Sequence, residues 1–260
     1  MDRHAEVAYE SIAPVYDDFT AHHDYEARIA MLLELATDNG LRAGASRALD
    51  VGCGTGKSFR PLLDRGWEVT ACDISASMAA LARERAGDRV RIEIADMREL
   101  PVLGSFDIAF CIDDAVNYLH SPEELTTTLR AVAANLEPDG VLIFDTNTIS
   151  IYRSFFAESF EVEANGVRMF WEGHGDGTAQ PGAITEASFS FEPLEGGTAV
   201  APEVHRQRHH PEPEVRAAID AAGLELAGLY GHGPDGVPSQ PMSEDAHTKA
   251  IYVARKRRTT

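Results

Sequence analysis

The chain has 260 residues, 44% of them hydrophobic and 25% charged, which is an ordinary globular composition and fits one domain with appendages. Its formal net charge is −19 and its one basic run is residues 255–258, so nucleic acids and anionic membranes are disfavoured as partners. The first residues do not resemble a signal peptide and no run of about 18 apolar residues occurs, so we expect a cytoplasmic protein.

The first part of the chain predicts two helices followed by alternating strands and helices. The helices cover 5–20 and 25–38, the second with an apolar stripe at helical spacing. Apolar strands are expected at 47–51, 67–72, 90–95, 106–112 and 141–146, with helices at 57–65, 75–86 and 121–136 between them. Apolar strands separated by helices are typical of a parallel sheet with right-handed crossovers.

The pattern changes after residue 157. Segments 159–172, 183–192 and 198–210 alternate polar and apolar residues, as strands of an antiparallel β-meander do. A helix at 212–222 and strands at 224–230 and 248–254 follow. We therefore expect an α/β protein whose seven-stranded, mostly parallel Rossmann-like sheet has helices on both faces. Its parts are an N-terminal helical cap (1–40), a core (41–157), a β insertion (158–210) and the final helix and strands (211–260).

The most informative segment runs from Leu49 to Gly56, between a predicted strand and a predicted helix. Glycines at 52, 54 and 56 allow a tight turn and let the backbone approach a ligand closely. The spacing is G-x-G-x-G after an acidic residue, which does not match the G-x-G-x-x-G of dinucleotide-binding proteins. An NAD-dependent oxidoreductase is therefore disfavoured.

The run Asp-Val-Gly-Cys-Gly-Thr-Gly at 50–56 resembles motif I of class I, Rossmann-like S-adenosylmethionine (SAM)-dependent methyltransferases. The segment 8–17, with Tyr9 and Tyr16, is similar to the cap helix of small-molecule members. The resemblance implies that SAM binds here and leaves as S-adenosylhomocysteine. It also implies that Asp73 accepts the ribose hydroxyls and that Asp96 contacts the adenine amino group. The residues expected to contact SAM are Tyr16, Asp50, Gly52, Cys53, Gly54, Thr55, Gly56, Asp73, Ile74, Met78, Asp96, Met97 and Cys111.

The acceptor is expected at the carboxyl ends of the strands, beside the segment that follows the fourth strand. This segment is unusually polar, and Asp113 or Asp114 could bind a cationic amine or cap the next helix. A loose alignment places Tyr118 where related sugar-amine N-methyltransferases have a histidine. Tyr118 and Asp114 are therefore catalytic candidates, with Asp113 and Asn117 as substrate contacts.

The β insertion supplies a second expected wall. Strand alternation places His205, Gln207 and His209 on one face, and His209 is the candidate base that reaches the substrate. Trp171 and His174 are expected to contact substrate, and the insertion could also form a homodimer surface. No histidine pair lies four residues apart on a predicted helix, as in a zinc enzyme, so no metal is expected.

These observations predict methyl transfer from SAM to a nitrogen, oxygen or carbon atom of a small metabolite, mainly by proximity and alignment, with an amine slightly favoured. Two alternatives stay open. One is a protein or RNA methyltransferase, which the net charge disfavours. The other is a SAM-binding protein without methyl transfer, because the glycine-rich loop and Asp73 report binding and not turnover.

Overall fold

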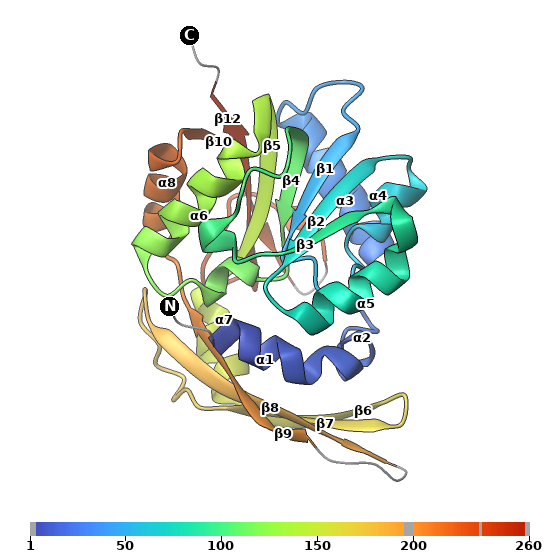
Figure 1. Ribbon diagram of the computed structural model, residues 1–260. Helices are drawn as coiled ribbons and strands as arrows, with labels where there is room; N and C mark the ends of the chain where they lie inside the picture. The colour runs from blue at the N-terminus through green and yellow to red at the C-terminus, as the bar shows by residue number, and fades with distance from the viewer. Residues whose placement is uncertain (1–3, 195–199, 234–235, 258–260) are drawn as a thin grey trace.

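Two sheets organise the chain in the computed structural model, which describes residues 4–194, 200–233 and 236–257 (Figure 1). Arg258, in the basic run, lies outside these ranges. The central sheet has the strand order β11-β10-β12-β5-β4-β1-β2-β3. Its strands are β1 (Arg47–Val51), β2 (Glu68–Asp73), β3 (Arg91–Ile94), β4 (Phe106–Cys111), β5 (Leu136–Asn147), β10 (Leu224–His232), β11 (Pro238–Ser239) and β12 (Lys249–Lys256).

The central sheet confirms the predicted Rossmann-like fold. Strands β1 to β5 pair in parallel, and β12 is antiparallel to both β5 and β10. The two-residue strand β11 pairs with β10 at the edge and adds an eighth strand to the seven expected. The parallel strands therefore present their carboxyl ends at a common edge, where this fold binds ligands.

Helices cover both faces of the central sheet. The helices of the described residues are α1 (His4–Ile12), α2 (Tyr16–Phe19), α3 (Tyr25–Asp38), α4 (Arg60–Asp64), α5 (Ala76–Ala86), α6 (Pro122–Ala134), α7 (Ile149–Arg153) and α8 (Glu212–Ala221), of which α3 to α6 and α8 cover these faces. Helices α3, α4 and α5 bury Ile29, Leu62 and Ala79 in one apolar core, whereas α6 and α8 bury Leu129 and Ile219 in the other. Each helix thus buries its apolar stripe against the strands.

The helix expected at 5–20 is interrupted. α1 ends at Ile12, a short 3₁₀ turn covers Ala13–Val15, and α2 begins at Tyr16. Pro14 explains the break, because proline lacks the backbone N–H that a continuing helix needs. The interruption lets the chain change direction over the glycine-rich loop.

The second sheet is antiparallel and contains β6 (Ser159–Ala164), β7 (Val167–Gly173), β8 (Ile184–Pro193) and β9 (Val200–Arg208) in that order. The segment 159–172, expected as one strand, is a hairpin that turns at Asn165 and Gly166, with φ of 51° and 83°. An Asn-Gly pair suits such a two-residue turn because both residues tolerate positive φ. The sheet therefore has one strand more than the alternation suggested.

Helix α1 lies between the two sheets (Figure 1). Ile12 and Val15 at its end pack in one core with Phe189 and Phe191 of β8 and with Tyr152 of α7. The antiparallel sheet thereby holds α1 over the carboxyl edge of the central sheet. In the described ranges, no helix is long and apolar enough to cross a membrane.

Candidate active site

A cavity of about 1000 Å³, counted out to the solvent at its mouth, lies at the carboxyl edge of the central sheet under α1. The loops after β1, β2, β3 and β4 form its floor, and the N-terminal cap (α1 to α3) covers it. The predicted site residues that line it are Tyr16, Gly52, Cys53, Gly54, Thr55, Asp73, Ile74, Asp96, Met97, Asp113 and Tyr118.

The glycine-rich loop is held against the end of β2. The N–H groups of Gly52 and Cys53 donate to the Cys72 carbonyl at 2.8 and 3.0 Å. Gly52 and Gly54 both have positive φ and both line the cavity, where their backbones face a ligand without a Cβ between. Gly56 serves packing instead, because a Cβ there would lie 2.4 Å from the Phe59 ring.

Asp73 provides a hydrogen-bond acceptor on the cavity wall. Its two carboxylate oxygens accept one N–H each, from Ser75 at 2.9 Å and from Gly54 at 2.8 Å. A carboxylate has about four lone-pair sites, so two remain for ligand donors. Burial raises the pKa of Asp73 to about 6. This donor set fits the two hydroxyls of a SAM ribose.

Asp50 lies behind the loop and does not line the cavity. One of its oxygens accepts from Ser58 Oγ at 2.5 Å, and the other is buried without a partner in the described ranges. Burial raises the pKa of Asp50 to about 7. Asp50 therefore acts on the site through Ser58, which does line the cavity.

Side-chain hydrogen bonds fasten the N-terminal cap to the glycine-rich loop. Thr55 Oγ1 donates to Asp17 at 2.6 Å, and Arg85 also binds Asp17. Lys57 Nζ donates to the Thr20 carbonyl at 2.9 Å. The cap is therefore closed over the part of the cavity where the cofactor is expected.

Three tyrosines gather at the end of the cavity where the acceptor is expected, which we call the acceptor end. The ring of Tyr9 lies 6.0 Å from that of Tyr16 and 5.4 Å from that of Tyr118. Burial raises the pKa of all three hydroxyls, and the charge of Asp114 raises each further. They are neutral phenols at physiological pH, so none of them serves as a phenolate base.

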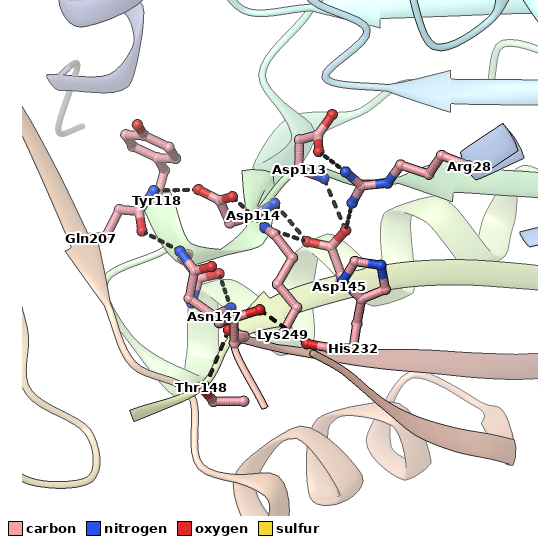
Figure 2. A network of polar contacts seen from close by, with 12 residues as sticks. Arg28, Asp113, Asp114, Tyr118, Asp145, Asn147, Thr148, Gln207, His232 and Lys249 are labelled. Atoms are coloured by element: carbon pink, nitrogen blue, oxygen red, sulfur yellow. Dashed lines mark hydrogen bonds and ion pairs between the residues drawn. The ribbon is translucent and has the colours of Figure 1, made fainter. Parts of the chain in front are cut away.

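A buried ionic network supports the loop after β4 (Figure 2). Asp113 and Asp114 both have positive φ, at 61° and 53°. Their N–H groups donate to the two oxygens of Asp145 at 3.0 and 2.7 Å, which fixes this unusual backbone. Arg28 bridges Asp113 and Asp145 at 2.5 and 2.8 Å, and Lys249 bridges Asp114 and Asp145 at 2.5 and 3.2 Å.

This network joins separate parts of the fold. Arg28 comes from α3 in the cap and Lys249 from β12 in the central sheet. Gln207 from β9 donates to Asp114 at 2.7 Å and accepts from Asn147 at 3.0 Å (Figure 2). The position of the loop after β4 thus depends on the cap and on both sheets.

Several residues expected at the cofactor lie outside the cavity. Met78 is fully buried in the core beneath α1, and Cys111, at the end of β4, is buried in the core beneath α6. With Asp50 and Gly56, they support the loops that line the cavity.

Four of the expected acceptor-side residues are likewise placed away from the cavity. Asn117 donates to the Arg208 carbonyl and accepts from the Asn147 N–H, and Trp171 donates to the Phe155 carbonyl. His174 contacts Ser188 at 3.0 Å on the antiparallel sheet. His209 contacts Glu244 at 3.0 Å and accepts from the Gly182 N–H, so both of its ring nitrogens have protein partners. Asp114 also lies outside the lining and acts from the ionic network.

The structure adds residues that the sequence reasoning missed. Tyr9, Tyr25 and Lys57 line the cavity, and His205 contacts Tyr118. Tyr9 lies in the segment that carries the cap resemblance, and His205 shares a strand face with His209, so both had a signal. Tyr25 begins a helix, as many other residues do, and had none. Among the described residues, no cluster of His, Cys, Asp and Glu could hold a metal ion.

Comparison with known proteins agrees with this geometry. Residues 48–140 match a family model described as a methyltransferase domain. The putative methyltransferase YqeM of Bacillus subtilis is 27% identical, over 96% of this chain and 98% of its own. A dTDP-3-amino-3,6-dideoxy-α-D-glucopyranose N,N-dimethyltransferase of Streptomyces fradiae is 29% identical over 82% of each chain.

The fold has solved counterparts. A SAM-dependent methyltransferase from Clostridium acetobutylicum superimposes with a TM-score of 0.79 at 22% identity, over 96% of this chain and 99% of that one. At this identity the likeness supports the fold, while the matched domain covers the glycine-rich loop, Asp73 and Asp96. Fold, loop and domain match agree, and the chain is a SAM-dependent methyltransferase.

Proposed function

We propose that the chain transfers the methyl group of SAM to an amine nitrogen of a small metabolite. The observation that carries this proposal is the charge of the ionic network behind the tyrosines. Within the described part of the chain, Asp113, Asp114 and Asp145 form ion pairs with Arg28 and Lys249, so three carboxylates meet two cations. The field of Asp114 reaches the hydroxyls of all three tyrosines, which places negative potential at the acceptor end.

That potential favours nitrogen over oxygen and carbon. SAM, when bound, supplies a methyl carbon on a positively charged sulfur. As a neutral amine attacks, positive charge moves onto nitrogen, where the network stabilises it. A phenol or a carbon acid must first become an anion, and a neighbouring negative charge disfavours that ionisation.

The remaining residues position the reactants. Gly52, Gly54 and Asp73 would hold the cofactor, and Tyr9 and Tyr16 on the cap exclude water from the reacting atoms. Tyr118 also lines the cavity, where it would contact the acceptor. The amine lone pair forms the new N–C bond as the C–S bond breaks, and the nitrogen then releases a proton to solvent.

The S. fradiae relative supports an amine, since its name describes N,N-dimethylation of an amino sugar. The net charge of −19 is a further argument against nucleic acid as the acceptor. A homodimer through the β insertion belongs to the proposal as well, and Val162 and Ile184 of that sheet are 43% and 41% exposed. Analytical ultracentrifugation tests it, and a monomer at micromolar concentration would remove it.

A panel of acceptors tests the proposed reaction. The protein and SAM are incubated with the dTDP-linked 3-amino sugar, its 3-hydroxy counterpart, small primary amines, a phenol and a carbon acid. We expect S-adenosylhomocysteine and a methylated product from one or more amines only. Methylation of the phenol or the carbon acid without any amine would overturn the assignment.

A further inference from the structure

His205 is linked to the acceptor end of the cavity by a hydrogen bond with Tyr118. It lies on the inward face of β9 with 5% of its surface exposed. Its Nδ1 is 2.7 Å from the Tyr118 hydroxyl, and its Nε2 is buried without a partner in the described part of the chain. The rings of Tyr9, Phe189 and Trp171 surround it, with centroids 5.6, 6.2 and 6.3 Å away.

These surroundings decide which nitrogen carries the proton. Burial lowers the pKa of His205 to about 4, so the ring is neutral at pH 7 and has one donor and one acceptor. Nε2 has no hydrogen-bond partner in the described ranges and the ring is enclosed by aromatic side chains, and a π face attracts an N–H and repels a lone pair. Nε2 therefore carries the hydrogen, and Nδ1 accepts the Tyr118 proton.

We propose that His205 is a positioning residue that fixes the polarity of Tyr118 and, with it, the kind of acceptor atom. The Tyr118 hydroxyl donates to His205 and accepts from Tyr9 at 3.1 Å. A phenol oxygen has one donor and two acceptor sites, so beside Tyr9 one acceptor site remains, which Gln207 also approaches and which a ligand donor in the cavity would take. Resting on the proposed function, this means that Tyr118 takes a hydrogen from the acceptor amine and orients it.

The consequence for specificity is direct. An amine that gives an N–H to Tyr118 keeps its own lone pair free to attack the methyl carbon. Primary and secondary amines meet this condition. A neutral tertiary amine or a carboxylate has no hydrogen to donate, so its lone pairs would face the lone pair of the Tyr118 oxygen and repel it. His205 thus selects acceptors without touching them, because it holds the Tyr118 proton away from the cavity.

Nitrogen-15 NMR of histidine-labelled protein tests the polarity without any substrate. The His205 signals are assigned by their loss or shift in Tyr118→Phe. At pH 7 we expect a pyridine-type resonance for Nδ1 and a pyrrole-type resonance for Nε2. A pyrrole-type Nδ1 would overturn the proposal, because Tyr118 would then accept from His205 and point its own proton into the cavity.

Two variants test the positioning role in turnover, with the best amine of the panel as the probe. The amide oxygen of His205→Asn can replace Nδ1 as the acceptor, whereas the longer side chain of His205→Gln reaches towards the Nε2 position. We expect His205→Asn to keep kcat within a few-fold and His205→Gln to lose roughly tenfold or more, with the SAM Kd unchanged in both. Equal losses in the two variants would contradict the proposal.

A double-mutant cycle separates positioning from simple packing. In a Tyr118→Phe background, His205→Gln should cause no further loss of kcat, because the hydroxyl through which His205 acts is gone. Additive losses would assign His205 a structural role only. If no panel amine is methylated, the proposed function fails while the NMR result still decides the polarity of His205.

Discussion

Buried carboxylates at the two ends of the cavity differ in their charged partners. Behind and beside the glycine-rich loop, Asp50 and Asp73 bond no cationic side chain of the described residues, and burial raises their pKa values to about 7 and 6. At the other end, Asp145 on β5 is equally buried. Its pKa is nevertheless lowered, because Lys249 and Arg28 outweigh the effect of burial. A buried aspartate thus lacks a cationic partner at the cofactor end of the cavity and is paired with Arg28 and Lys249 at the acceptor end.

This difference separates binding residues from supporting residues. Where the chain supplies its own cations, the carboxylate holds a backbone conformation, as Asp145 holds the loop at Asp113 and Asp114. Where it supplies none, a carboxylate on the cavity wall keeps lone pairs for a ligand, as Asp73 does. A buried charged group that destabilises the folded protein until a ligand binds is a good candidate for contacting that ligand.

The largest effect is expected for Asp145→Asn. The substitution leaves Arg28 and Lys249 without their shared partner in a buried site, which typically costs about 3–5 kcal/mol. Urea denaturation measures the loss. Adding Lys249→Met should not recover it, because Lys249 still pairs with Asp114 in the single variant and its removal leaves that buried carboxylate without a cation. A loss below about 1 kcal/mol in the single variant would show that the network does not support the loop.

A smaller effect on binding is expected for Asp73→Asn. Asparagine keeps one oxygen for the backbone but cannot accept both ribose hydroxyls as a carboxylate does. Hydrogen bonds to charged groups contribute about 1.5–3 kcal/mol, so the SAM Kd should rise roughly 10- to 100-fold by calorimetry. Asp88→Asn, at an exposed position, is the matched control. Unchanged affinity in Asp73→Asn would reject its ribose role.

The smallest effect is a gain in stability from Asp50→Asn. The folded pKa of Asp50 is about 7, above its ordinary value of 3.8, so the native state holds this proton more tightly than the unfolded chain. Native stability therefore falls as pH rises from about 4 to 7, and the penalty is complete at pH 8. Asparagine removes the penalty, and we expect a gain of about 1–2 kcal/mol at pH 8.

Thermal denaturation at two pH values checks this sign. The gain from Asp50→Asn should shrink markedly at pH 5, where the wild-type carboxyl is already protonated in the folded state. A gain of equal size at pH 5 and pH 8 would mean that packing and not charge produces it.

The cofactor side of the site could be predicted from the sequence because its main elements are close together along the chain. The strand, the glycine turn and the following helix lie within residues 47–64, and nine of the residues expected to contact SAM line the cavity. Met78 and Cys111 were misplaced for a physical reason. Each follows or ends a strand near the site, and only the three-dimensional packing shows which neighbouring side chain faces the core.

The acceptor side depends on contacts between distant segments. Tyr118 and His205 are 87 residues apart, and Arg28 and Asp113 are 85 apart. Strand alternation placed His205 and His209 on the same face but could not say which of them faces Tyr118, because that depends on how the second sheet packs on the first. The Asn165-Gly166 turn is different, since its local signal was present and was missed.

Calorimetric titration with SAM at pH 8 and pH 5, with NADH as a control ligand, tests the central claim most directly. The ionised Asp73 should bind SAM at one site at pH 8. With a pKa of about 6, its protonation should weaken binding about tenfold at pH 5. Asp73→Asn should lose most of this pH dependence. Equal affinity of the wild-type protein at both pH values, or no binding at pH 8, would contradict the account.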